Sequence, residues 1–142
     1  MTPGIEGRAL VEGDASGILL RLEEPLSFWG GVDPVAGRIV DRRHPDFGRS
    51  VTGTILAMPS GRGSSSSSSV LAEAIRAGTG PAGIVMAVPD GIVALGAMVA
   101  AELYGVVVPV IVVAREAFET IPSGANAVIR GTHLAWSPAQ DR

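Results

Sequence analysis

Over the first 60 residues, short apolar runs alternate with clusters of glycine, proline and charged side chains. This spacing is typical of β-strands that are joined by tight turns. The predicted strands cover Arg8–Val11, Ile18–Leu22, Gly37–Asp41 and Val51–Met58. Because the turn 13–17 lies between the first two strands, we expect them to pair as a hairpin.

After residue 60 the apolar residues follow a helical repeat in place of the alternation. Val70, Leu71, Ala74 and Ile75 fall on one face of a predicted helix, which the glycines and proline of 78–81 should end. The chain is therefore expected to pass from a strand to a helix across a serine-rich stretch.

Two further apolar runs, Ala82–Val88 and Val106–Val113, predict buried strands with a helix over Ile92–Tyr104 between them. That helix is apolar almost all round, so we expect it to be packed on both sides. The alternation of strands and helices predicts parallel strands joined by right-handed crossovers. A short helix or turn over Ala114–Thr120, a strand over Ala127–Arg130 and an edge strand or tail over His133–Trp136 complete the pattern.

This order predicts the α/β fold class, with a β-rich N-terminal half packed on a small βαβαβ unit. At 142 residues the chain is expected to form one domain. Within it, residues 1–60 are expected to be mainly β, residues 61–130 α/β, and residues 131–142 a tail.

The composition, with 46% hydrophobic and 18% charged residues, is that of a globular protein. A net charge of -3 provides no basic footprint for nucleic acid or for an anionic membrane. The chain shows neither a signal-peptide pattern nor an apolar stretch long enough to cross a bilayer, so we expect a cytoplasmic protein. Because cysteine and lysine are absent, the chain offers no thiolate ligand and no Schiff base.

The stretch 59–69 carries the clearest chemical signal: a Gly-Arg-Gly segment and six consecutive serines run into the predicted helix. The N–H groups of a first helical turn, with the helix dipole, favour an anion or a developing oxyanion, and serine is a preferred helix cap. Arg62 adds a planar group suited to a carboxylate or phosphate. A flexible serine linker is the alternative, but the strand and helix that bound the run argue against it.

A longer series of motifs surrounds this stretch: Gly30–Pro34, Gly37–Asp41, His44–Pro45, Gly53–Leu56 and Pro59–Ser66. Together they resemble the swivelling domain, or small subunit, of the aconitase X family, and the resemblance covers most of the chain, to about residue 113. It implies an aconitase-type swivelling β/β/α domain.

The resemblance also implies a hydro-lyase, because the known activities of the family are dehydrations of cis-3-hydroxy-L-proline or of phosphomevalonate. A large subunit would hold an iron–sulfur cluster or metal, which this chain alone would not bind. The arginine, alanine and glycine bias suggests a bacterial protein, which favours cis-3-hydroxy-L-proline, converted to a pyrroline carboxylate, over phosphomevalonate. The expected partners are a large aconitase X subunit and a small hydroxy acid.

In the wider aconitase superfamily the base is a serine alkoxide in a Gly-Ser-Ser turn, which Gly63, Ser64 and Ser65 match. The resemblance thus implies Ser64 as the base, with Ser65 as its rival. Arg62 would stabilise the alkoxide or bind the substrate carboxylate, and Gly63 and Ser66 would bind the substrate beside it. Because aconitase has an arginine where Ser66 stands here, both roles of Arg62 remain open.

Asp33 and His44 lie in two other polar loops, which the resemblance places near the active-site face. The alternative for each is a local role, Asp33 in an Asx turn before Pro34 and His44 in a turn before Pro45. His133 is expected to be a surface histidine.

Other classes of function use the same residue types. A Ser-His-Asp hydrolase is disfavoured because the Gly-x-Ser-x-Gly motif is missing around Ser64. A phosphate-binding protein stays open, although the lysine of a P-loop is absent. A non-catalytic subunit that caps or regulates a partner is the third alternative, and substitution of Ser64 and Ser65 would separate it from a catalytic one.

Overall fold

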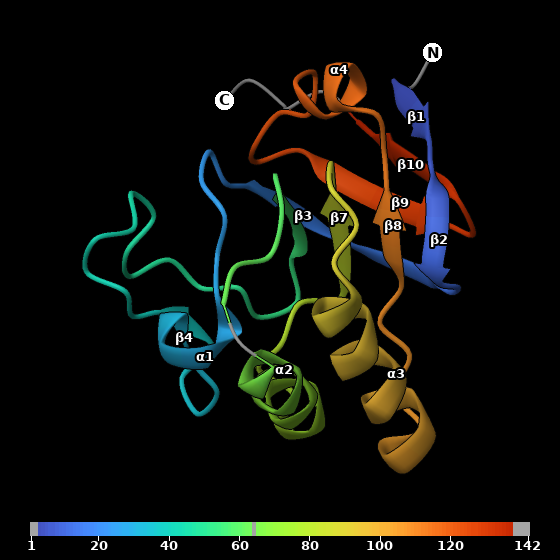
Figure 1. The fold of residues 1–142 in the computed structure, drawn as a ribbon. Coiled ribbons are helices and arrows are strands. Elements are labelled where there is room, and N and C mark those ends of the chain that lie inside the picture. Colours follow the sequence, from blue (N-terminus) through green and yellow to red (C-terminus); the bar gives the residue numbers. More distant parts are fainter. Residues whose placement is uncertain (1–2, 64, 138–142) are drawn as a thin grey trace.

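The structure is a computed structural model that describes residues 3–63 and 65–137. Its elements form one eight-stranded sheet in the order β1-β10-β9-β3-β6-β7-β8-β2 and a two-stranded ribbon of β4 and β5 (Figure 1). The strands are β1 (Gly4–Glu6), β2 (Arg8–Val11), β3 (Asp14–Arg21), β4 (Val32–Asp33), β5 (Arg38–Ile39), β6 (Ile55–Met58), β7 (Gly83–Met86), β8 (Val110–Val112), β9 (Asn126–Arg130) and β10 (His133–Trp136), and the helices are α1 (Phe28–Gly31), α2 (Ser66–Ala77), α3 (Gly91–Tyr104) and α4 (Arg115–Phe118).

Strands β3, β6, β7 and β8 are parallel neighbours, as the alternation of strands and helices predicts. Every residue of β6 and β7 is buried, which is characteristic of a parallel sheet covered on both faces. Successive side chains of a strand point to opposite faces. Accordingly, Leu56 and Met58 contribute to a core shared with α2 and α3, whereas Ile55 and Ala57 belong to a second core.

The second core lies against the antiparallel strands β1, β10, β9 and the first half of β3. Helices α2 and α3 lie side by side at the other side of the parallel strands (Figure 1). The predicted β/β/α arrangement is therefore confirmed.

Strands β2 and β3 do not form the predicted hairpin. Strand β2 pairs with β8, and β3 pairs with β9 along its first half and with β6 along its second. The prediction was wrong because β3 begins at Asp14, within the expected turn, and both strands have apolar partners from later in the chain. Strands β1 and β2 stand at the two ends of the strand order, yet only Gly7 separates them in the chain. The N–H of Gly7 donates to the carbonyl of Thr132 (2.8 Å), so one nearly continuous segment joins the two ends of the sheet.

Three strand predictions need smaller corrections. The strand predicted over Val106–Val113 covers only Val110–Val112, because Val106 and Val107 are exposed and precede the sheet. The strand predicted from Val51 begins only at Ile55, because Gly53, with φ of 69°, turns the chain before it. The strand over His133–Trp136 exists, but it is not an edge strand. It lies between β9 and β1. Strand β1 was not predicted from the sequence.

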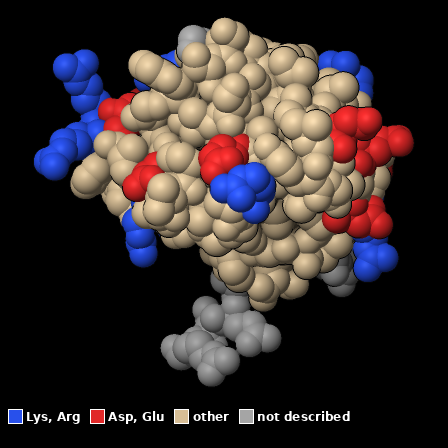
Figure 2. All heavy atoms as spheres, turned by 90° about the horizontal axis from the view of Figure 1, so that it is seen from below, with Lys and Arg blue, Asp and Glu red and all other residues tan. Residues whose placement is uncertain are grey.

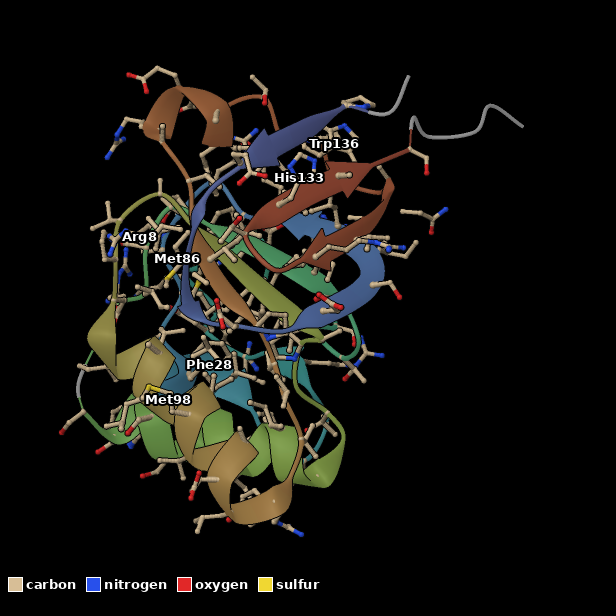
Figure 3. The ribbon with its side chains drawn as sticks, turned by 90° about the vertical axis from the view of Figure 1, so that its right-hand side faces the viewer. Arg8, Phe28, Met86, Met98, His133 and Trp136 are labelled. Atoms are coloured by element: carbon tan, nitrogen blue, oxygen red, sulfur yellow. The ribbon has the colours of Figure 1, made fainter. Side chains whose placement is uncertain are left out.

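Helix α3 ends as predicted at Gly105, but it is not packed on both sides within this chain. Leu95, Met98 and Leu103 are 50%, 52% and 67% exposed. Seen from below the view of Figure 1, the surface is largely uncharged, with most charged side chains at its borders (Figure 2). Met98 lies on α3 at the opposite end of the molecule from His133 and Trp136 (Figure 3). The apolar residues all round α3 therefore did not show whether the helix is buried on every side or has an apolar face that is exposed.

Candidate functional site

The serine loop, defined here as residues 59–66, leads from the end of β6 into α2. The carbonyl of Pro59 accepts the N–H groups of Ala87 and Val88, each at 3.1 Å, which fastens the loop to the chain that leaves β7. The loop therefore lies at the carboxyl ends of the parallel strands, where open α/β sheets bind ligands.

Helix α2 begins at Ser66, inside the serine run, as the sequence predicts. Ser64, the predicted base, lies outside the described residues. Ser65 precedes the helix with φ of -57° and ψ of -23°, and its hydroxyl makes no capping hydrogen bond, so the predicted side-chain cap is not formed by Ser65. Arg62, Gly63, Ser65 and Ser66 are all exposed, so this edge of the chain is open to a ligand or a partner.

Asp90, which the sequence analysis did not name as part of the site, lies against the loop from the side of α3. Its Oδ1 accepts the N–H groups of Ile92 (2.8 Å) and Val93 (3.2 Å) and so caps α3. A β-carbon at Gly61 would collide with the other oxygen of Asp90, so the two segments lie in direct contact. An aspartate between an apolar strand and an apolar helix is a helix-cap signal that could have identified it.

Replacing Asp90 by alanine is expected to lower the free energy of unfolding by about 1 kcal/mol, because two N–H groups lose their acceptor. For a chain of this size, that change lowers Tm by about 3 °C in thermal denaturation followed by circular dichroism. Asp90→Asn keeps a capping oxygen and serves as the control. Equal losses in the two variants would contradict the capping role.

The segment 26–29 lies on the other side of the serine loop. Leu26 forms a parallel bridge with Gly61, and the N–H of Arg62 donates to the carbonyl of Leu26 (3.2 Å). Further along, Ser67 in the first turn of α2 contacts the backbone of Trp29, whose side chain is 60% exposed. The sequence analysis did not name Leu26 or Trp29 as part of the site, and it included Ser67 only as one of the six serines of the run.

Asp33 is placed away from the serine loop. Its Oδ1 accepts the N–H of Val35 (2.8 Å), which is the Asx turn of the local alternative. The carbonyl of the following residue, Pro34, accepts a hydrogen bond (2.6 Å) from the hydroxyl of Thr79, which lies just beyond the C-terminal end of α2. Since α2 has 12 residues and each adds about 1.5 Å, its two ends lie about 18 Å apart. The structure does not bring Asp33 together with the serine turn.

His44 is buried and has hydrogen-bond partners at both ring nitrogens. Its Nδ1 accepts the N–H of Asp46 (3.0 Å), so the proton is on Nε2, which donates to the carbonyl of Glu24 (3.3 Å). Glu24 follows β3 and precedes Leu26, which bridges to the serine loop. The loop of His44 thus lies along the same edge of the sheet, although the imidazole bonds to neighbouring backbone groups.

His133 is a surface histidine, as predicted, and lies far from the serine loop on β10 (Figure 3). Its Nδ1 is 2.9 Å from one carboxylate oxygen of Glu6, and the Thr132 hydroxyl donates to the other (2.8 Å). The hydrogen bond from Thr132 and then that from His133 lower the pKa of Glu6. This cluster pins β1 to the end of β10 and takes no part in the candidate site.

A hollow of about 370 Å³ lies at the opposite edge of the parallel strands. It is lined by residues that precede β6, β7 and β8, among them Thr52, Ala82 and Val108. The hollow is therefore separate from the serine loop.

Among the helices of the described ranges, none has the length and apolar character that a bilayer crossing requires.

The closed sheet, the paired helices on one side and the exposed serine loop define an aconitase-type swivelling domain. The chain belongs to the aconitase X family: residues 4–135 match the family model described as the aconitase X swivel domain. The family predicted from the sequence is confirmed.

A cis-3-hydroxy-L-proline dehydratase of Pseudomonas aeruginosa is 53% identical over 103 residues, which are 72% of this chain and 18% of that protein. A phosphomevalonate dehydratase small subunit of Pyrococcus furiosus is 44% identical over 96 residues, or 68% of this chain and 72% of that one. The holo-form crystal structure of Thermococcus kodakaraensis aconitase X matches with a TM-score of 0.86 at 28% identity, covering 96% of this chain and 99% of that chain. This chain spans about a fifth of the length of the cis-3-hydroxy-L-proline dehydratases that it matches.

Proposed function

We propose that this chain acts as the small subunit of an aconitase X type hydro-lyase and, with a large subunit, dehydrates a small hydroxy acid. The observation that carries the proposal is the exposed serine loop at the carboxyl edge of the parallel strands, on a chain whose relatives are named dehydratases. The loop and the start of α2 would close over a substrate held by the partner.

The substrate that we favour is cis-3-hydroxy-L-proline, which would lose water to give a pyrroline-2-carboxylate. Its support is the 53% identity to the enzyme of Pseudomonas aeruginosa, compared with 44% to the small subunit of Pyrococcus furiosus. Phosphomevalonate is the second candidate, because the latter match covers 72% of a protein that is itself a small subunit.

An iron–sulfur cluster or metal, which the family resemblance implies, does not fit the donor set of this chain. The sequence contains no cysteine, and no three His, Asp or Glu side chains are grouped as ligands within residues 3–63 and 65–137. We assign that group to the large subunit, and the chemistry proposed for this chain is limited to its own residues.

The chemistry of this chain would be removal of the proton α to the substrate carboxylate. A serine hydroxyl is a poor base at neutral pH, so its alkoxide needs N–H donors and a nearby cation. Ser64 is the proposed base, and its rival is Ser65, which immediately precedes the first turn of α2. Arg62, exposed in the same loop, would stabilise the alkoxide or bind the carboxylate.

Co-expression with the large subunit and assay of both substrates test this function. We expect the complex to convert cis-3-hydroxy-L-proline and to leave phosphomevalonate unchanged, and either subunit alone to be inactive. Conversion of phosphomevalonate alone would transfer the assignment to the second candidate. Loss of water from neither substrate would overturn the proposed activity.

A further inference from the structure

Ser67 differs from the serines around it because it is buried, with 4% of its surface exposed. Its Oγ lies 3.2 Å from the backbone nitrogen of Trp29 and 3.2 Å from the Oγ of Ser27. A buried hydroxyl with two partners from a segment 40 residues away joins that segment to the first turn of α2.

The directions of these hydrogen bonds follow from the donors available. Ser27 donates its single hydroxyl proton to the carbonyl of Trp29 (2.9 Å), so it accepts from Ser67. Ser67 in turn accepts the backbone N–H of Trp29. The two hydroxyls and the backbone N–H and C=O of Trp29 thus form a closed set in which each donor has an acceptor.

This closed set lies directly beneath the serine loop. A β-carbon at Gly63 would be 2.5 Å from the Oγ of Ser27 and 3.5 Å from the Oγ of Ser67. Ser27 and Ser67 therefore lie against Gly63, which immediately precedes the two candidate bases in the sequence. The hydrogen bonds of Ser27 and Ser67 to the backbone of Trp29 hold that residue, with its exposed side chain, beside the same two serines.

We propose that Ser27 and Ser67 are positioning residues that hold the serine turn and Trp29 in a fixed relation, so that the base meets the substrate in the productive geometry. The proposal rests on the proposed function for its catalytic consequence. The placement of Trp29 can be measured without turnover. Misplacement of a reacting group by about 1 Å can cost about 100-fold in rate, so small movements of the turn are sufficient.

Ser67→Ala, Ser27→Ala and the double variant test this inference in the complex with the large subunit. Each single variant is expected to lower kcat between about 10-fold and 100-fold and to change KM by less than about twofold. The double variant should lose no more than about either single variant, because both changes break the same closed set. Ser69→Ala, at an exposed position in the same helix, is the matched control and should retain kcat.

Acrylamide quenching of tryptophan fluorescence provides the readout that does not depend on activity. Trp29 is 60% exposed and Trp136 is 8% exposed, so Trp29 dominates the quenchable emission of this chain, which is measured before the large subunit is added. Quenching should rise in both single variants, change no further in the double variant, and stay at the wild-type level in Ser69→Ala. Unchanged quenching, or effects that multiply in the double variant, would overturn the inference. Altered quenching of the variant chains, together with a wild-type complex that dehydrates neither substrate, would uphold the placement and count against the proposed function.

Discussion

Ser64→Ala is expected to lower kcat of the two-subunit complex by about a thousandfold while the complex still assembles. A positioned general base contributes about 10² to 10⁴ in rate, and alanine removes the only atom of this side chain that can accept a proton. Steady-state assays with cis-3-hydroxy-L-proline measure kcat, and size-exclusion chromatography shows whether the variant chain still binds the large subunit.

Ser65→Ala separates the two candidate bases in the same assay. With Ser64 as the base, Ser65→Ala should retain most of kcat, since Ser65 makes no side-chain capping bond whose loss would disturb α2. The reverse outcome would assign the base to Ser65. Full turnover in both variants would contradict a catalytic serine in this chain and would favour the non-catalytic capping subunit.

The parallel half of the fold could be predicted because its sequence signals are local and agree with the final packing. The buried runs of β6 and β7 read as strands, and Gly78 and Gly105 end the helices where the periodicity stops, each with a positive φ. The antiparallel half could not be predicted in the same way. Its strand partners lie up to 131 residues apart, as for Gly4 and Ala135, and no local pattern specifies such a pairing.

The candidate site shows the same division. The serine loop and the start of α2 were recognisable from the sequence, because an apolar strand and an apolar helix enclose them. Ser67 was not, since it stands in a run of six identical residues and only its burial against Trp29 distinguishes it. Asp33 was grouped with the loop by resemblance, yet the bond between Pro34 and Thr79 places it at the far end of α2.

Gly63→Ala is expected to lower kcat of the complex by about 100-fold with little effect on assembly. Gly63 has φ of 110°, a conformation that residues with a β-carbon rarely adopt. The added carbon would also lie 2.5 Å from Ser27 Oγ and 3.2 Å from Ser27 Cβ. An exposed loop can relieve both strains by moving away from Ser27, and that movement displaces the serine turn. Steady-state kinetics of the reconstituted complex would measure the loss.

Gly78→Ala is the matched control, because it imposes a positive φ without the collision. Gly78 has φ of 79°, and nothing lies within 4 Å of a β-carbon built there. Alanine at this helix end should lower the free energy of unfolding by about 1 kcal/mol and Tm by about 3 °C, while kcat stays within about twofold of wild type. Gly63→Ala should show the opposite combination, a large loss of kcat with a small change in Tm. Equal losses of kcat in the two variants would mean that backbone strain in general, and not the contact with Ser27, controls turnover.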